Sequence, residues 1–110
     1  MSAGRQEKRS ATRVSINRDF ESIEEFVAEY ARDISLTGVF IRSKHPLPVG
    51  TQVNLKFSLI HQDIEIIEGV GEVVRTVQPP QREAGMGVKF LELTAESRDY
   101  IMQAGSRALR

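Results

Sequence analysis

The feature that most constrains the fold is a two-residue alternation of apolar and polar side chains, interrupted by glycine and proline. Alternation of this kind is typical of β-strands with one buried face. We expect strands that begin near Arg13 and cover about 39–41, 52–59, 64–77 and 87–93, with a further extended segment over about 22–36. Short connections favour antiparallel pairing. Six antiparallel strands would close into a small barrel with no exposed edge.

Residues 22–31 are the ambiguous element of this pattern. Phe26 and Tyr30 share a face in an extended chain, and helical spacing also fits because the segment contains no helix breaker. We favour a strand there. After Thr94, a suitable helix N-cap, the apolar spacing becomes helical and predicts a helix over about 95–109.

Composition limits the function classes. The chain has 110 residues, enough for one domain, and its 15 basic and 15 acidic side chains give a net charge of zero. This balance argues against DNA or RNA as partners. The absence of cysteine excludes disulfides and thiolate metal sites. No apolar run is long enough to span a membrane, and the polar N-terminus does not resemble a signal peptide. We therefore expect a cytoplasmic protein with no membrane insertion.

Catalytic and metal-binding motifs are not found. His45 and His61 lie in expected loops and are not spaced as a metal pair on one element. The carboxylates of residues 21–29 have no apolar pocket that would separate their pKa values. We expect no enzymatic activity, no catalytic residue, no metal site and no cofactor.

Two short motifs carry more information. Arg9 and Arg13 form an RxxxR pair in a basic arm over residues 1–13, and residues 33–38 form a DxSxxG run. In a strand, Asp33 and Ser35 project from the same face, while Ile34 and Leu36 point into the core. Each motif alone is weak, because any basic tail offers RxxxR and a DxSxxG run also suits a simple turn.

Together, in this order, the motifs resemble the PilZ domain, a bacterial family whose members commonly bind the second messenger cyclic di-GMP. Pro46–Gly50 and Gly85–Phe90 are also similar to PilZ segments. The resemblance implies an all-β fold with a terminal helix: a six-stranded antiparallel barrel over 14–110 with the helix at its C-terminal end, preceded by the flexible arm.

The resemblance also implies roles for the motif residues. Arg9 and Arg13 would fold over the ligand, since an arginine fork fits both a guanine edge and a phosphate. Asp33 would accept hydrogen bonds from guanine N–H groups, and Ser35 would bind the ligand beside it. Gly38 would permit close approach of the backbone.

Three further positions follow from the family pattern. Arg42 resembles a basic position that some members use against the ligand. Arg75 stands where many members carry a tryptophan near the guanine, and the alternative is a surface strand residue. Lys8 precedes Arg9 at a position that influences whether one or two ligand molecules are held.

The resulting hypothesis is a non-catalytic cyclic di-GMP receptor that signals to an unidentified protein partner when the ligand orders the arm. The alternative is a PilZ adaptor that binds a protein partner without any ligand. An oligonucleotide-binding barrel is disfavoured, because the five Phe and two Tyr lie mostly at core positions.

Overall fold

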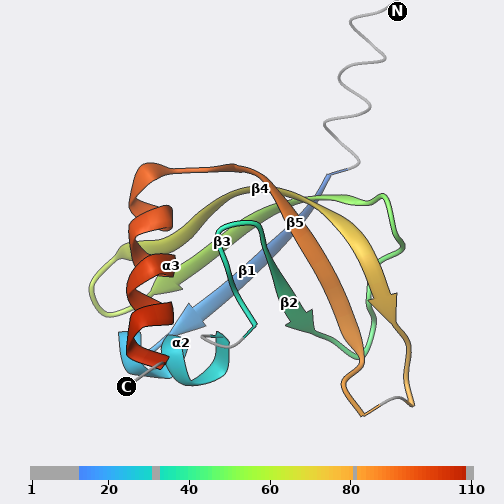
Figure 1. The fold of residues 1–110 in the computed structure, drawn as a ribbon, viewed down its shortest axis with the longest axis horizontal. Coiled ribbons are helices and arrows are strands. Elements are labelled where there is room, and N and C mark those ends of the chain that lie inside the picture. The colour runs from blue at the N-terminus through green and yellow to red at the C-terminus, as the bar shows by residue number, and fades with distance from the viewer. Residues whose placement is uncertain (1–12, 31–32, 81, 109–110) are drawn as a thin grey trace, which may run out of the picture.

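The structure is a curled β-sheet with two helices at one side (Figure 1). The computed structural model describes residues 13–30, 33–80 and 82–108, with side chains up to residue 103. Its elements are β1 (Val14–Phe20), α2 (Ile23–Tyr30), β2 (Gly38–Arg42), β3 (Gln52–Leu59), β4 (Ile64–Val77), β5 (Gly85–Leu93) and α3 (Ala95–Ala108). The expected class, mostly β with a C-terminal helix, is confirmed.

The number of strands and their closure differ from the prediction. The described residues form one five-stranded sheet with the order β1-β3-β4-β5-β2, not six strands. This sheet curls into a half-barrel, and β1 and β2 are its two edges. The missing strand is the segment expected over residues 22–31, in which Ile23–Tyr30 form α2.

Helix α2 has a local signal that the alternation pattern concealed. The Ser22 Oγ accepts a hydrogen bond from the Glu25 backbone N–H at 3.2 Å, and the Glu25 carboxylate accepts one from the Glu21 N–H at 2.7 Å. Ser-x-x-Glu with such reciprocal bonds is a form of the capping box that begins helices. Phe26 and Tyr30 lie four residues apart, and both are buried on the inner face of the helix.

The pairing of β1 also corrects an expectation. β1 runs parallel to β3, with Val14 opposite Val53 and Phe20 opposite Leu59. Parallel strands require a long crossover, and residues 21–51, which include α2 and β2, supply it. The other strand pairs, β3–β4, β4–β5 and β2–β5, are antiparallel as expected. The long strand β4 shifts register against β5 between Val70 and Gly71 and between Val73 and Arg75.

Four aromatic rings form the centre of the core beneath α2. Phe20 lies 5.5 Å from Phe26 in an edge-to-face arrangement, and Tyr30 lies 5.1 Å from Phe57, measured between ring centroids. All four side chains are nearly inaccessible to solvent. Aromatic pairs at such distances contribute about 0.5–1.5 kcal/mol each beyond the burial of their area. This cluster fixes α2 against β1 and β3.

Helix α3 is attached to β4 through one buried serine. The Ser97 backbone N–H donates to the Thr94 Oγ1 at 3.2 Å, which makes Thr94 the N-cap as predicted. The Ser97 Oγ accepts a hydrogen bond from the Glu68 backbone N–H at 2.7 Å. Ile101, on the next turn, is buried against the core. The Glu68 N–H of the sheet is therefore hydrogen-bonded to a side chain of the helix.

Candidate functional site

Asp33 lies at the surface, at the junction between α2 and β2. Its backbone N–H donates to the Tyr30 carbonyl at 2.9 Å, and its carbonyl accepts from the Phe40 N–H at 3.0 Å. These bonds hold Asp33 beside β2. Its carboxylate, 26% exposed, forms an ion pair with the Arg42 guanidinium at 3.3 Å. The structure thus brings together two residues that the sequence singled out.

Ser35 and Gly38 shape the turn before β2. The Ser35 Oγ lies 2.9 Å from the Thr37 Oγ1 and also accepts from the Thr37 N–H at 3.2 Å. Ser35 is exposed, and its N–H donates to the Gly38 carbonyl at 2.9 Å. Ile34 is buried as expected, whereas Leu36 is 44% exposed, so the prediction that Leu36 points into the core is wrong. The chain turns after Ile34 and does not continue as a strand.

Gly38 has a packing role of its own. A Cβ atom at this position would lie 2.4 Å from the Val88 carbonyl oxygen of β5. Real Cβ atoms do not approach a backbone oxygen so closely, so a side chain would push β2 away from β5. The absence of a side chain at Gly38 therefore allows β2 and β5 to lie close together.

Arg75 stacks on an aromatic ring that the sequence analysis missed. Phe40 of β2 and Arg75 of β4 are both register partners of Gly87 on β5. Because Gly87 has no side chain between them, the Arg75 guanidinium reaches a position 5.6 Å from the centre of the Phe40 ring. This distance is that of a cation–π contact.

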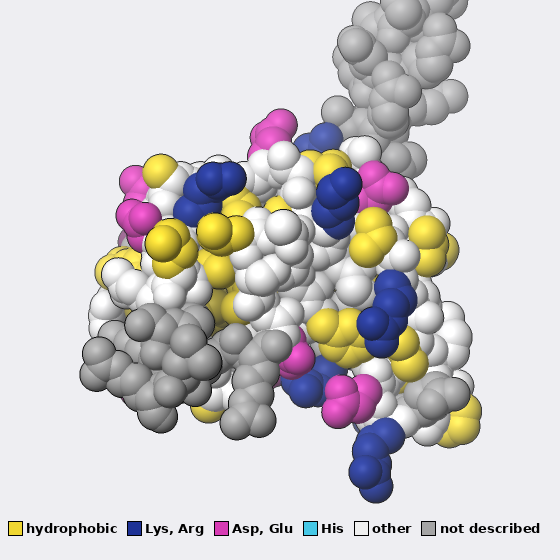
Figure 2. All heavy atoms as spheres, viewed as in Figure 1, with side chains coloured by type: hydrophobic (Ala, Val, Ile, Leu, Met, Phe, Trp, Pro, Cys, Tyr) yellow, Lys and Arg dark blue, Asp and Glu magenta, His cyan; other side chains and the backbone are white. Residues whose placement is uncertain are grey.

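These residues surround a surface hollow, here called the Asp33 hollow, of about 410 Å³. It is lined by Asp33, Phe40, Arg75, Val77, Arg82 and Glu83. Figure 2 shows basic and acidic side chains around hydrophobic ones at the lower right of the face in view, where β2 and β4 end and β5 begins in Figure 1. The hollow combines a hydrogen-bond acceptor, a flat cationic surface and an exposed loop.

Phe40, Arg82 and Glu83 were not among the predicted site residues. For Phe40 a signal existed: Val39 and Ile41 are both buried, so strand alternation turns Phe40 outward. An outward aromatic residue between Gly38 and Arg42 on the same face indicates a surface site. Arg82 and Glu83 lie in the loop between β4 and β5, where no periodicity applies.

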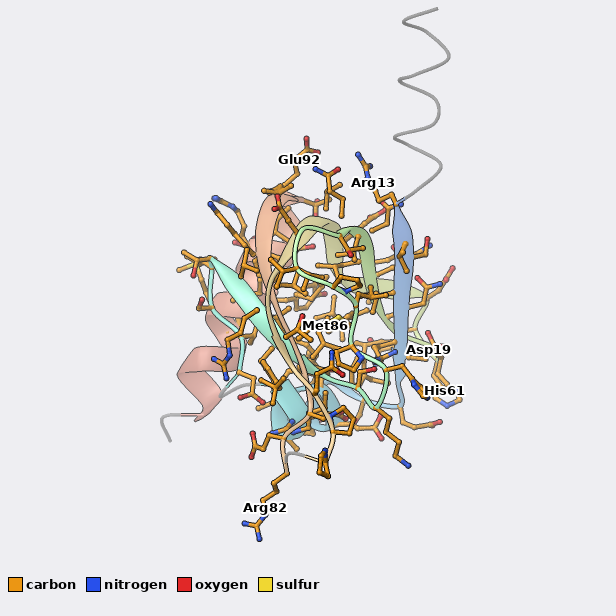
Figure 3. The ribbon with its side chains drawn as sticks, turned by 90° about the vertical axis from the view of Figure 1, so that its right-hand side faces the viewer. Arg13, Asp19, His61, Arg82, Met86 and Glu92 are labelled. Atoms are coloured by element: carbon orange, nitrogen blue, oxygen red, sulfur yellow. The ribbon has the colours of Figure 1, made fainter. Side chains whose placement is uncertain are left out.

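Of the predicted arm residues Lys8, Arg9 and Arg13, the structure describes Arg13. Lys8 and Arg9 lie outside the described residues. Arg13 is described: its Nη1 donates to the Asn54 Oδ1 at 3.3 Å, and its Nε is buried without a hydrogen-bond partner. Arg13 lies at the end of the sheet opposite to Arg82 (Figure 3). It does not line the Asp33 hollow.

The described ranges contain no group of three or more His, Cys, Asp or Glu side chains placed to hold a metal ion. His61 instead bonds the Glu21 carboxylate at 2.7 Å, and both side chains are exposed. Among the helices of residues 13–30, 33–80 and 82–108, none is long and apolar enough to cross a bilayer.

Comparison with known proteins agrees with the fold and with the position of the motifs. A comparison with curated proteins gives no match. The family model described as the PilZ domain matches residues 4–104, which is most of the chain and includes both sequence motifs. The structure adds the curled sheet and the C-terminal helix that this resemblance implied. The chain therefore belongs to the PilZ domain family.

Proposed function

We propose that this PilZ domain is a bacterial cytoplasmic receptor that binds cyclic di-GMP on the outer face of β2, β5 and β4. Family membership supplies the coarser part of this statement. PilZ domains form a family that binds cyclic di-GMP or acts as adaptors, and they are non-catalytic. The chain is accordingly not an enzyme.

The observation that carries the finer proposal is the Arg75–Phe40 stack beside the Asp33 carboxylate. A guanine presents a flat ring and, on its edge, N–H donors. Asp33 is an acceptor for those donors. Arg75, in contact with the Phe40 ring, offers a planar cation on which a base can stack. Arginine can thus substitute for the tryptophan common at this position in the family.

The two phosphates require cations, and the site offers several. Arg42 lies next to Asp33, and Arg82 lines the same hollow. We propose that Arg13 exchanges its hydrogen bond to Asn54 for a contact with the bound ligand and that Arg9 contacts the ligand beside it. We propose further that Ser35 and Gly38 mark the other edge of the ligand and that Lys8 influences ligand stoichiometry. Ordering the arm costs roughly 1–2 kcal/mol of backbone entropy per fixed residue. Charge-assisted hydrogen bonds of about 1.5–3 kcal/mol each offset that cost.

The test is calorimetric titration of the whole chain with cyclic di-GMP. We expect binding, and we expect Arg9→Ala, Arg13→Ala and Asp33→Asn each to weaken it by about 1–3 kcal/mol, the scale of a lost bidentate base contact. Arg98→Ala, which removes an exposed arginine from α3, is the matched control and should leave affinity unchanged. Absence of binding by the folded wild-type chain would favour the ligand-independent adaptor instead.

A further inference from the structure

A second hollow lies beside the first and is richer in positive charge. It has a volume of about 780 Å³ and lies between the segment after β2 and the loop between β4 and β5. We call it the basic hollow. Its lining residues are Arg42, Ser43, Lys44, His45, Pro79, Arg82 and Ala84. Arg82, labelled in Figure 3, extends from the lower end of the molecule, away from the sheet.

Hydrogen bonds of the protein hold the walls of the basic hollow in place. The Ser43 backbone N–H donates to the Ala84 carbonyl at 3.0 Å, which continues the β2–β5 ladder by one step. On the other side, the Thr76 hydroxyl donates to the Leu47 carbonyl at 2.8 Å and fixes the segment after the hollow onto β4. A surface held from both sides is already organised for binding, which lowers the entropic cost of association.

The charges of the basic hollow are largely uncompensated. Arg42, Lys44 and Arg82 line it, all three are exposed, and no acidic side chain is among the lining residues. Of these cations only Arg42 has an ion-pair partner within the described part of the chain. Lys44 and Arg82 are the two cations left without such a partner, and like charges at one place are unfavourable unless an anionic group neutralises them.

The kind of anion follows from the other lining groups. Pro79 and Ala84 provide apolar surface between the cations. The N–H groups of Ser43 and His45 already donate within the protein, to the Ala84 carbonyl and to the Ser43 Oγ at 3.0 Å, so they cannot converge on a phosphate. A basic rim around apolar surface fits a peptide that carries both carboxylates and apolar side chains.

We propose that the basic hollow is the docking surface for an acidic segment of a partner protein. The Asp33–Arg42 ion pair connects this surface to the Asp33 hollow, because Arg42 lines the basic hollow while its partner Asp33 lines the other. A ligand that engages the Asp33 carboxylate frees Arg42 to bind the acidic segment. This coupling, which rests on the proposed cyclic di-GMP site, is reciprocal: the partner then strengthens ligand binding by the same factor.

The docking surface can be tested without any nucleotide. A fluorescein-labelled peptide of alternating Asp and Leu is titrated with the whole chain at low ionic strength, and fluorescence anisotropy is recorded. We expect binding, and we expect the double variant Lys44→Gln/Arg82→Gln to weaken it about tenfold. The variant Lys56→Gln/Arg98→Gln removes the same net charge elsewhere on the exposed surface and should bind like the wild type.

Three results would overturn the docking proposal. One is no peptide binding by the folded wild-type chain. Another is equal weakening in the two double variants, which would indicate general charge attraction. The last is tighter binding of a single-stranded oligonucleotide of equal charge through Lys44 and Arg82, which would make the hollow a polyanion site.

The coupling has its own measurement. Asp33→Asn removes the partner of Arg42, so we expect it to tighten peptide binding in the absence of cyclic di-GMP. An unchanged affinity in Asp33→Asn would contradict the coupling while leaving the docking surface intact. Because these titrations contain no nucleotide, their failure is distinct from a failure to bind cyclic di-GMP.

Discussion

The guanidinium carbon of Arg75 lies 5.6 Å from the centre of the Phe40 ring, and Gly87 lies between the two strands that carry them. The contact exists because β5 presents a glycine where a side chain would separate the two groups. Phe40 therefore acts as a positioning residue that holds the Arg75 guanidinium over its ring.

Removing the cationic plane should weaken ligand binding. We expect Arg75→Ala to weaken cyclic di-GMP binding by about 1–3 kcal/mol, the scale measured for loss of one base-stacking partner. Arg75→Trp should retain binding, because an indole also offers a flat surface. Calorimetric titration checks both variants. Equal affinities of Arg75→Ala and the wild type would remove Arg75 from the site.

Gly38 should be essential for the sheet although it is exposed to solvent in part. In Gly38→Ala the new methyl group meets the Val88 carbonyl oxygen at 2.4 Å, so β2 or β5 must move. We expect the free energy of unfolding to fall by about 1–3 kcal/mol, the usual cost of overpacking. Gly87→Ala is the matched control, since its methyl group finds its nearest neighbour, the Arg75 Cβ, at 3.4 Å. Urea denaturation of both variants should separate them.

Ser97 should contribute more to stability than its size suggests. In Ser97→Ala the Glu68 backbone N–H loses the acceptor it now has at 2.7 Å. An unsatisfied buried donor costs about 1–3 kcal/mol. Ser15→Ala, on the exposed face of β1, should change stability by less than about 0.5 kcal/mol. Thermal unfolding followed by circular dichroism would show the difference, and similar melting temperatures would contradict it.

Tyr30 should make stability depend on pH under alkaline conditions. Burial raises the pKa of the Tyr30 phenol above its ordinary value of 10.0, and the Arg18 guanidinium opposes this rise. The unfolded chain therefore loses the Tyr30 proton at a lower pH than the folded chain does. The stability contributed by the neutral phenol is complete below about pH 10 and is lost as the pH rises further toward the folded-state pKa.

Tyr30→Phe tests this dependence. The variant cannot ionise at position 30, so the unfolding free energy of the wild type should fall more steeply than that of the variant above about pH 10. Urea midpoints measured from neutral to alkaline pH provide the comparison. Parallel pH profiles for the two proteins would show that Tyr30 ionises equally in the folded and unfolded states.

Much of the fold could be predicted because strand alternation is unambiguous where one face is buried. Residues 52–59, for example, alternate without exception, and β3 has the predicted bounds. The prediction of a strand over residues 22–31 was wrong because Phe26 and Tyr30, four residues apart, share one face in a strand and also in a helix. The Ser22-x-x-Glu25 capping pattern would have favoured the helix over the strand. Apolar periodicity does not detect it, because neither Ser22 nor Glu25 is apolar.

The residues of the candidate site could be predicted only where they belong to a sequence motif or to the family pattern. Asp33 and Arg42 lie together as ion-pair partners, yet Phe40 and Arg82 join the site through strand register and loop position. The parallel pairing of β1 was likewise not visible locally, because it depends on what the intervening residues 21–51 form. Contacts between distant segments are set by the packing of the whole domain, so a short stretch of the sequence does not reveal them.

The parallel pairing of β1 with β3 fixes the point from which the N-terminal arm leaves the sheet. Arg13 is anchored at Asn54, at the end of the sheet away from Arg82. An extended chain spans at most about 3.6 Å per residue, so the Arg9 backbone lies within about 14 Å of the Arg13 backbone. Arg9 can therefore contact only groups within that distance plus the length of its own side chain, and inserting residues between Arg9 and Arg13 would extend this reach.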